Sequence, residues 1–139
     1  MKKKIVGILV CMLLVISGFS MTAIADPGAN LENKIFGGFP LIFGIRNVGG
    51  AIVNTGDAIA HNVSFNFTVT GGSNGLIDYT YADYWGDLLP NGSLGIATDA
   101  VQGFGLVTLT LSASSSNAGN VTETAKGFQL GYFTWVPMS

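Results

Sequence analysis

The chain of 139 residues has little charge, one cysteine and one histidine. Lys and Arg number 6 against 8 Asp and Glu, so the formal net charge is -2 and there is no basic surface for nucleic acid. A single Cys excludes a disulfide framework and Cys-rich metal sites. The length excludes barrel enzymes and two-domain dinucleotide enzymes. A hydrophobic content of 48% is too high for a disordered chain.

The N-terminus has the three parts of an export signal. Lys2 to Lys4 are followed by an apolar run from Ile5 to Ile16, and Ala23-Ile24-Ala25 has small residues where signal peptidase cleaves. We therefore expect residues 1–25 to be a signal peptide. The alternative is an uncleaved anchor, because Ile5 to Ile24 is about long enough to span a bilayer as a helix. Small and polar residues weaken the second half of that run.

Cleavage would change the charge of the mature protein. It would remove the only Cys and leave Lys34, Arg46 and Lys126 against eight acidic residues, a formal charge of -5. The remaining 114 residues are enough for one hydrophobic core. An acidic, Cys-free domain fits an exported prokaryotic protein. We expect an N-terminal lead at 26–33, a single domain at 34–136, and a location outside the cell or on its surface.

The mature sequence favours strands, because it has no sustained helical period and alternates strongly in places. From His61 to Thr70, mainly apolar residues at odd positions alternate with Asn, Ser and Thr at even positions, which predicts one buried and one hydrated face. Turn-forming residues separate the runs. The pattern predicts an all-β, antiparallel, immunoglobulin-like β-sandwich of about seven strands. Strands are expected at 34–38, 41–48, 51–53, 60–70, 76–84, 93–99, 105–113 and 121–135, the last with a possible break at Gly127 or Gly131.

Several turn-and-strand segments resemble a known family. The segments are Arg46-Asn47-Val48-Gly49, Asn54-Thr55-Gly56-Asp57-Ala58 and Ala60-His61-Asn62-Val63-Ser64-Phe65. They resemble the N-x-G-x-x-x-A-x-N-V pattern of CARDB-type immunoglobulin-like domains. Such domains occur in exported bacterial and archaeal cell-surface proteins. The segment Leu88-Leu89-Pro90-Asn91-Gly92-Ser93 is similar to their L-x-P-G, with Asn91 inserted. The resemblance covers residues 34–135 and implies a module for adhesion, spacing or assembly. It brings no catalytic residues with it.

Catalysis lacks its usual side chains in this chain. The expected mature protein has no Cys and a single His, His61, which the alternation places on a core face near the start of a strand. A lone His provides neither a nucleophile–base pair nor a set of metal ligands. We therefore expect no enzymatic activity, no catalytic residues and no bound cofactor.

The segment 78–87 contains three acids that are candidate metal ligands: Asp78, Asp83 and Asp87. Ca²⁺ takes several oxygen ligands, although this spacing matches no compact calcium loop. A paired-carboxylate glycosidase would need a sugar-sized cleft, for which a small sandwich has little room. The structural alternative is a solvated edge strand whose acids discourage pairing with another sheet.

The same segment also contains Tyr84 and Trp85, which are candidates for contact with a ligand or partner. Exposed aromatic rings beside carboxylates stack on sugar rings or dock on proteins. The alternative is that Trp85 closes one end of the core.

Glycosylation is a further possibility for an exported chain. Asn-x-Ser/Thr occurs at Asn62, Asn66, Asn91 and Asn120, and the modification depends on the host. The alternation places Asn62 and Asn66 on one outward face.

The sequence as a whole predicts a non-catalytic exported module for adhesion, spacing or assembly. The alternative is a small-ligand binding module for carbohydrate or calcium, using the segment 78–87. The expected partners are other cell-surface proteins, or a second copy through the sheet edges. Nucleic acid is excluded, and a membrane contact is expected only through an uncleaved N-terminus.

Overall fold

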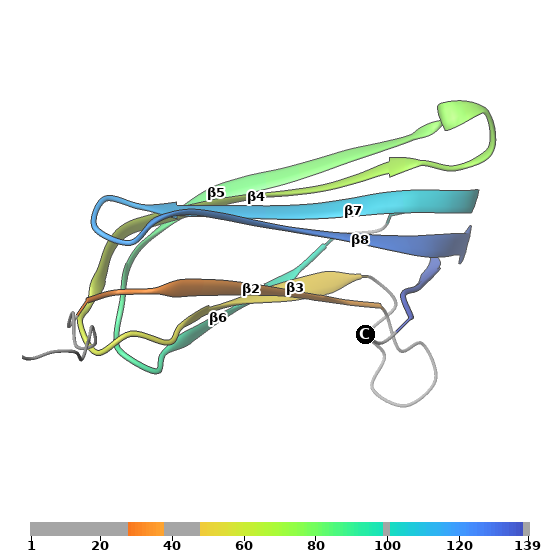
Figure 1. Ribbon diagram of the computed structural model, residues 1–139. Coiled ribbons are helices and arrows are strands. Elements are labelled where there is room, and N and C mark those ends of the chain that lie inside the picture. Colours follow the sequence, from red (N-terminus) through yellow and green to blue (C-terminus); the bar gives the residue numbers. More distant parts are fainter. Residues whose placement is uncertain (1–27, 38–47, 99–100, 138–139) are drawn as a thin grey trace, which may run out of the picture.

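The computed structural model describes residues 28–37, 48–98 and 101–137. Two antiparallel sheets pack face to face in these ranges (Figure 1). The smaller sheet has the order β2-β3-β6 and consists of β2 (Leu31–Phe36), β3 (Gly49–Asn54) and β6 (Ser93–Ala97). The larger sheet has the order β5-β4-β7-β8-β9 and consists of β4 (Ala60–Gly71), β5 (Ile77–Leu88), β7 (Gly103–Ser115), β8 (Gly119–Gly131) and β9 (Phe133–Trp135).

This architecture confirms the predicted all-β, immunoglobulin-like sandwich. The strand bounds differ in detail: β2 begins at Leu31, inside the expected lead, and β5 continues to Leu88. The C-terminal run breaks after Gly131, one of the two expected positions, where φ is 64°. The expected signal peptide and nearly all of the expected strand at 41–48 lie outside the described residues.

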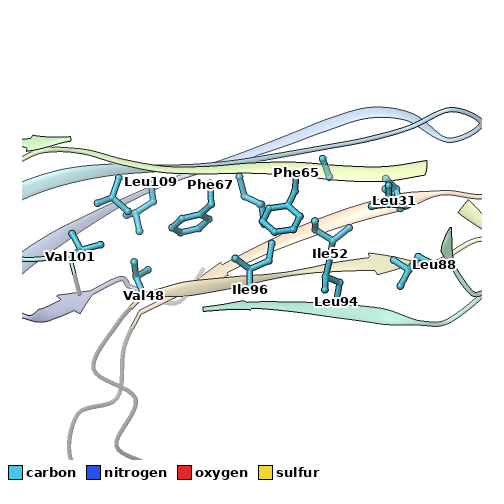
Figure 2. Packing of buried hydrophobic residues seen from close by; sticks show 14 of the residues in the cluster. Leu31, Val48, Ile52, Phe65, Phe67, Leu88, Leu94, Ile96, Val101 and Leu109 are labelled. Carbon is cyan, nitrogen blue, oxygen red and sulfur yellow. The ribbon is translucent and has the colours of Figure 1, made fainter. Parts of the chain in front are cut away.

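The core lies between the two sheets, as the alternation requires. Three fully buried side chains show this arrangement (Figure 2). Phe67 and Leu109 point from the larger sheet toward the smaller one, and Ile52 points from the smaller sheet toward the larger one. Burial of one such side chain is worth about 1.5–3 kcal/mol. The side chains that alternate with them on β4, β7 and β8 form the outer face of the larger sheet.

The Asn-Thr-Gly-Asp turn between β3 and β4 is held by its own side chains. Asn54 is fully buried, and its Oδ1 accepts hydrogen bonds from the backbone N–H groups of Asn30 and Gly56, both at 3.1 Å. Its Nδ2 donates to the carbonyl of Leu88 at 3.0 Å. Asp57 Oδ1 accepts from Gly28 N at 2.7 Å. The start of the described chain is thereby fixed at the end of the sandwich where β4 begins.

Candidate functional site

Two β-bulges in the β4–β5 pair change the direction of His61. The register shifts on both sides of Val63, and Asn62 and Gly86 have φ of 55° and 106°. Ala60 and Val63 are therefore both buried, while His61 is exposed. The expectation that His61 faces the core is wrong, because an extra residue in a strand reverses the alternation.

A polar cluster forms around these bulges and consists of His61, Asn62, Tyr84, Asp87 and Ser116. Asn62 Oδ1 accepts a hydrogen bond from the Tyr84 hydroxyl at 2.9 Å, and Asn62 Nδ2 donates to Ser116 Oγ at 3.2 Å. His61 Nδ1 lies 3.1 Å from Asp87 Oδ2, and both side chains are about half exposed. The cluster is a hydrated, hydrogen-bonded surface rather than a buried site.

The three candidate calcium ligands stay apart. Asp78 lies opposite Thr70 and Asp83 opposite Phe65, so they occupy different heights along β5. Within the described ranges, no group of three or more His, Cys, Asp or Glu side chains is placed to hold a metal ion. The strand itself is an outer edge of the larger sheet. This is the position in which acids oppose edge-to-edge pairing.

The two candidate aromatic residues are both accessible. Tyr84 is 62% exposed and Trp85 is 55% exposed. The alternative in which Trp85 closes the core is therefore wrong. Tyr81 turns the other way, and its ring meets Phe65 edge-on with centroids 5.6 Å apart. The ring of Tyr84, which belongs to the polar cluster, and the ring of Trp85 are thus accessible to a ligand.

The four candidate glycosylation residues are all exposed. Asn62, Asn91 and Asn120 lie toward the end of the sandwich where β4 begins, and Asn66 lies near the middle of β4. Asn91 is in the turn between β5 and β6, and Asn120 is at the start of β8. Asn66 is on the outer face of β4, opposite Ser112. The side-chain amide of Asn62 is already hydrogen-bonded in the polar cluster. We call this end the sequon end; it is on the left in Figure 1.

The other end of the outer face carries an apolar surface that the sequence analysis missed. We define it by its six side chains: Phe104, Leu106, Phe128, Leu130, Phe133 and Trp135. Cross-strand pairing puts them on one face, because Phe104 lies opposite Leu130 and Phe128 lies opposite both Leu106 and Trp135. Leu106 is 75% exposed and Trp135 is 55% exposed. The rings of Phe104 and Phe128 are in edge contact, 5.3 Å apart.

A groove of about 410 Å³ runs through this surface. Its lining includes five of the six apolar side chains and Pro137, and its single charged residue is Lys126. This end, where β7 begins and β8 ends, is on the right in Figure 1, and we call it the apolar end.

Buried polar side chains on the inner face explain why this surface points outward. Gln129 is fully buried, and its Nε2 donates to the carbonyls of Val101 and Gly131, both at 2.9 Å. The hydroxyl of the buried Thr134 donates to Gln129 Oε1. These bonds hold β9 in register with β8. Successive side chains of a strand point to opposite faces of the sheet. The residues next to Gln129 and Thr134 on these strands therefore face outward, and they include Phe128, Leu130 and Trp135.

One sequence signal marks the apolar surface. Leu106 and Val107 are adjacent apolar residues at a point where β7 otherwise alternates, so only one of them can face the core. Val107 is buried and Leu106 is exposed. An apolar residue on each side of a strand indicates that both faces are covered or that one is an exposed patch.

Comparison of the chain with protein-family models, with curated proteins and with solved structures gives no match. The resemblance to CARDB-type domains therefore rests on its turn and strand segments alone. In the part of the chain that the structure describes, no helix is both long enough and apolar enough to span a bilayer.

Proposed function

We propose that this protein is an exported, non-catalytic module that is retained at the cell surface by the apolar surface of its larger sheet. The observation that supports this function is the apolar surface itself. Soluble monomers rarely expose contiguous apolar patches of this kind unless they bind something. Leu106, Leu130 and Trp135 are each more than half exposed, although they are neighbours on three adjacent strands.

The rigidity of the surface also supports a docking role. The hydrogen bonds of Gln129 and Thr134 fix β8 and β9 from the buried side. A side chain added at Gly127 would bring its Cβ within 2.7 Å of the Trp135 carbonyl, so the close approach of β9 depends on glycine there. A preformed surface loses little conformational entropy when it binds.

Retention at the cell surface tests this function. Leu106→Gln would place an amide in the centre of the apolar surface, and Thr110→Gln is the matched control on the same strand and face. In the host, we expect Leu106→Gln to shift the protein from the cell fraction into the medium, while Thr110→Gln behaves like the wild type. Equal retention of both variants would contradict the proposed function.

A small-ligand function is the second candidate, favoured by Tyr84 and Trp85. Both rings are more than half exposed. Tyr84 is bonded to Asn62, whose backbone N–H donates to the Asp87 carboxylate, and Trp85 follows Tyr84 in the strand. This arrangement suits a sugar, whose apolar face stacks on an aromatic ring while its hydroxyls bond to polar groups. Titration of Trp85→Ala against soluble oligosaccharides, with Trp135→Ala as control, separates this function from the first. Loss of binding in both variants alike would exclude a site at Trp85.

A further inference from the structure

We propose that the apolar surface docks on a lipid bilayer with anionic headgroups, so that the sandwich stands on the membrane with its sequon end outward. This inference rests on the proposed function, because it names what covers the surface. It differs from the expectation that a membrane is met only through an uncleaved N-terminus.

Most of the exposed large hydrophobic side chains lie at the apolar end, while Tyr84, Trp85 and Leu89 lie at the sequon end. Leu76, 81% exposed, is in the turn after β4, and this turn is tied to β7 by a 2.7 Å hydrogen bond from Gly72 N to the Leu106 carbonyl. Tyr132 is exposed in the turn between β8 and β9. The turn after β4 and the end of β8 lie at the same end of the sandwich (Figure 1). Leu76 and Tyr132 therefore extend the apolar surface into a tip of leucines and aromatic rings. Trp, Tyr and Phe favour the interface between headgroups and acyl chains.

The charge in the groove favours an anionic bilayer over a second copy of the chain. Lys126 lines the groove, and its lining residues include no carboxylate. If two copies packed surface against surface, two Lys126 ammonium groups would enter an apolar interface without a partner, which is unfavourable. At a bilayer, the aliphatic stem of Lys126 lies along the apolar surface while its ammonium group reaches a lipid phosphate.

The sequon end has the properties of a surface that faces water. Of the three acids of β5, Asp83 and Asp87 lie on the sequon side, where they are kept away from an anionic bilayer. Asp78 lies at the other end of the strand, opposite Thr70. The Asn91 and Asn120 side chains are exposed at the sequon end as well. Any glycan added at these positions would point away from the membrane. The positions of Asp83, Asp87, Asn91 and Asn120 thus give the same orientation as the apolar tip, and Asp78 is the exception.

An N-terminal anchor would orient the molecule in the opposite way. Gly28 is bonded to Asp57 at the sequon end, so a retained Ile5 to Ile24 segment would bring Trp85 rather than Trp135 close to the bilayer. The two orientations can be distinguished because the chain has two tryptophans, one toward each end.

The test measures the depth of each tryptophan in vesicles. The exported protein, recovered from its host with Trp85→Phe or Trp135→Phe, is mixed with vesicles of phosphatidylcholine alone or with phosphatidylglycerol, some carrying brominated acyl chains. We expect a blue shift and bromine quenching for Trp135, stronger with phosphatidylglycerol, and neither effect for Trp85. Quenching of Trp85 but not Trp135, or no binding to either vesicle, would overturn the inference.

Two variants test the roles of the side chains. Leu106→Gln should weaken vesicle binding by on the order of tenfold or more, since it removes a leucine from the buried area. Lys126→Gln should bring binding to anionic vesicles down to the level seen with phosphatidylcholine alone. Thr110→Gln should bind as the wild type. Circular dichroism checks that each variant is folded, and an unchanged affinity in folded Leu106→Gln would contradict the proposed contact.

Failure of this inference is distinguishable from failure of the proposed function. If Leu106→Gln releases the protein from cells but the wild type ignores both vesicles, the surface binds a protein and only the lipid assignment fails. If the wild type forms a dimer in sedimentation without lipid and Leu106→Gln does not, a second copy covers the surface. If neither retention nor vesicle binding depends on Leu106, both proposals fail.

Discussion

The outer face of the larger sheet has two halves with opposite surface chemistry. Both halves are built on β7 and β8. Toward the sequon end, hydroxyl groups meet across strands, with Ser64 Oγ 2.9 Å from Ser114 Oγ and Ser112 Oγ 3.0 Å from Thr122 Oγ1. Toward the apolar end, the equivalent outward positions hold Leu106 and Phe128. Both halves satisfy the same backbone ladder. The backbone ladder therefore does not account for the difference between their side chains.

The inner face shows the complementary difference. Under the hydroxyl-rich half, Phe67 and Leu111 fill the core. Under the apolar half, Gln129 and Thr134 are buried with their hydrogen bonds made inside the protein. On β8 and β9 the apolar end thus reverses the usual arrangement, with Gln129 and Thr134 inside and Leu130 and Trp135 outside, while Val101 and Val107 are buried nearby. Such a reversal is unfavourable for an isolated domain, which agrees with the proposed contact at that end.

The largest expected effect comes from breaking the buried support of the apolar half. Gln129→Ala would leave the Val101 carbonyl and the Thr134 hydroxyl without their partner and would leave a cavity. We expect the free energy of unfolding to fall by about 2–4 kcal/mol, measured by urea denaturation. Gln102→Ala, at an exposed position nearby, is the control and should change little. Equal stability of the two variants would contradict the supporting role of Gln129.

A smaller effect is expected from the bulge that shapes the sequon end. Asn62 combines a φ of 55° with side-chain bonds to Tyr84 and Ser116. Asn62→Ala loses the bonds and adds backbone strain, and should cost about 1–2 kcal/mol. Asn62→Gly loses the bonds but tolerates the backbone, so it should cost less. The urea midpoints of the two variants test which one is less stable. A lower midpoint for Asn62→Gly than for Asn62→Ala would contradict the role given to the positive φ of Asn62.

Making the apolar half resemble the hydroxyl half should alter binding more than stability. Leu106→Thr together with Leu130→Thr replaces two exposed leucines with a residue that suits strands. We expect the free energy of unfolding to change by roughly 0.5 kcal/mol or less per site. Binding of an apolar fluorescent dye should drop sharply. A large loss of stability would show that these leucines contribute to the core.

The smallest effect is expected at the ion pair of the polar cluster. His61 and Asp87 are in contact but about half exposed, so water screens their attraction. His61→Gln should change the free energy of unfolding by about 0.5 kcal/mol or less. A double-mutant cycle with Asp87→Asn measures the coupling. A coupling well above that figure would mean that the pair is organised for a function of its own.

Much of the fold follows from the alternation of side chains. In β4 from Val63 to Thr70 the apolar positions are buried, and the same holds in β7 from Val107 onward. The turn at Asn54 to Asp57 also follows from its residue types, since Asn54 accepts the Gly56 N–H as such turns do. The burial of alternate side chains and the turn both depend on residues close together in the sequence, so they can be predicted from it.

The orientation of His61 and the apolar surface were missed by the sequence analysis, because neither follows from the alternation of apolar and polar residues along a strand. The bulges around Asn62 and Gly86 add residues to both strands and turn His61 outward. In the segment from Phe128 to Tyr132 the buried side chain is the polar Gln129, because its partner Thr134 comes from another strand. Whether an apolar stripe faces a core or solvent depends on the second sheet, which covers only part of the first.

Footprinting on the host cell surface would test the central claim, that the apolar end is the contact surface, most directly. Hydroxyl radicals would modify the protein in free solution and on intact cells, and mass spectrometry would compare the two ends. We expect Phe104, Leu106 and Trp135 to be protected on cells, while Tyr84 and Trp85 react equally in both states. Protection of Tyr84 and Trp85 with full reactivity at Trp135 would contradict the account and move the contact to the sequon end.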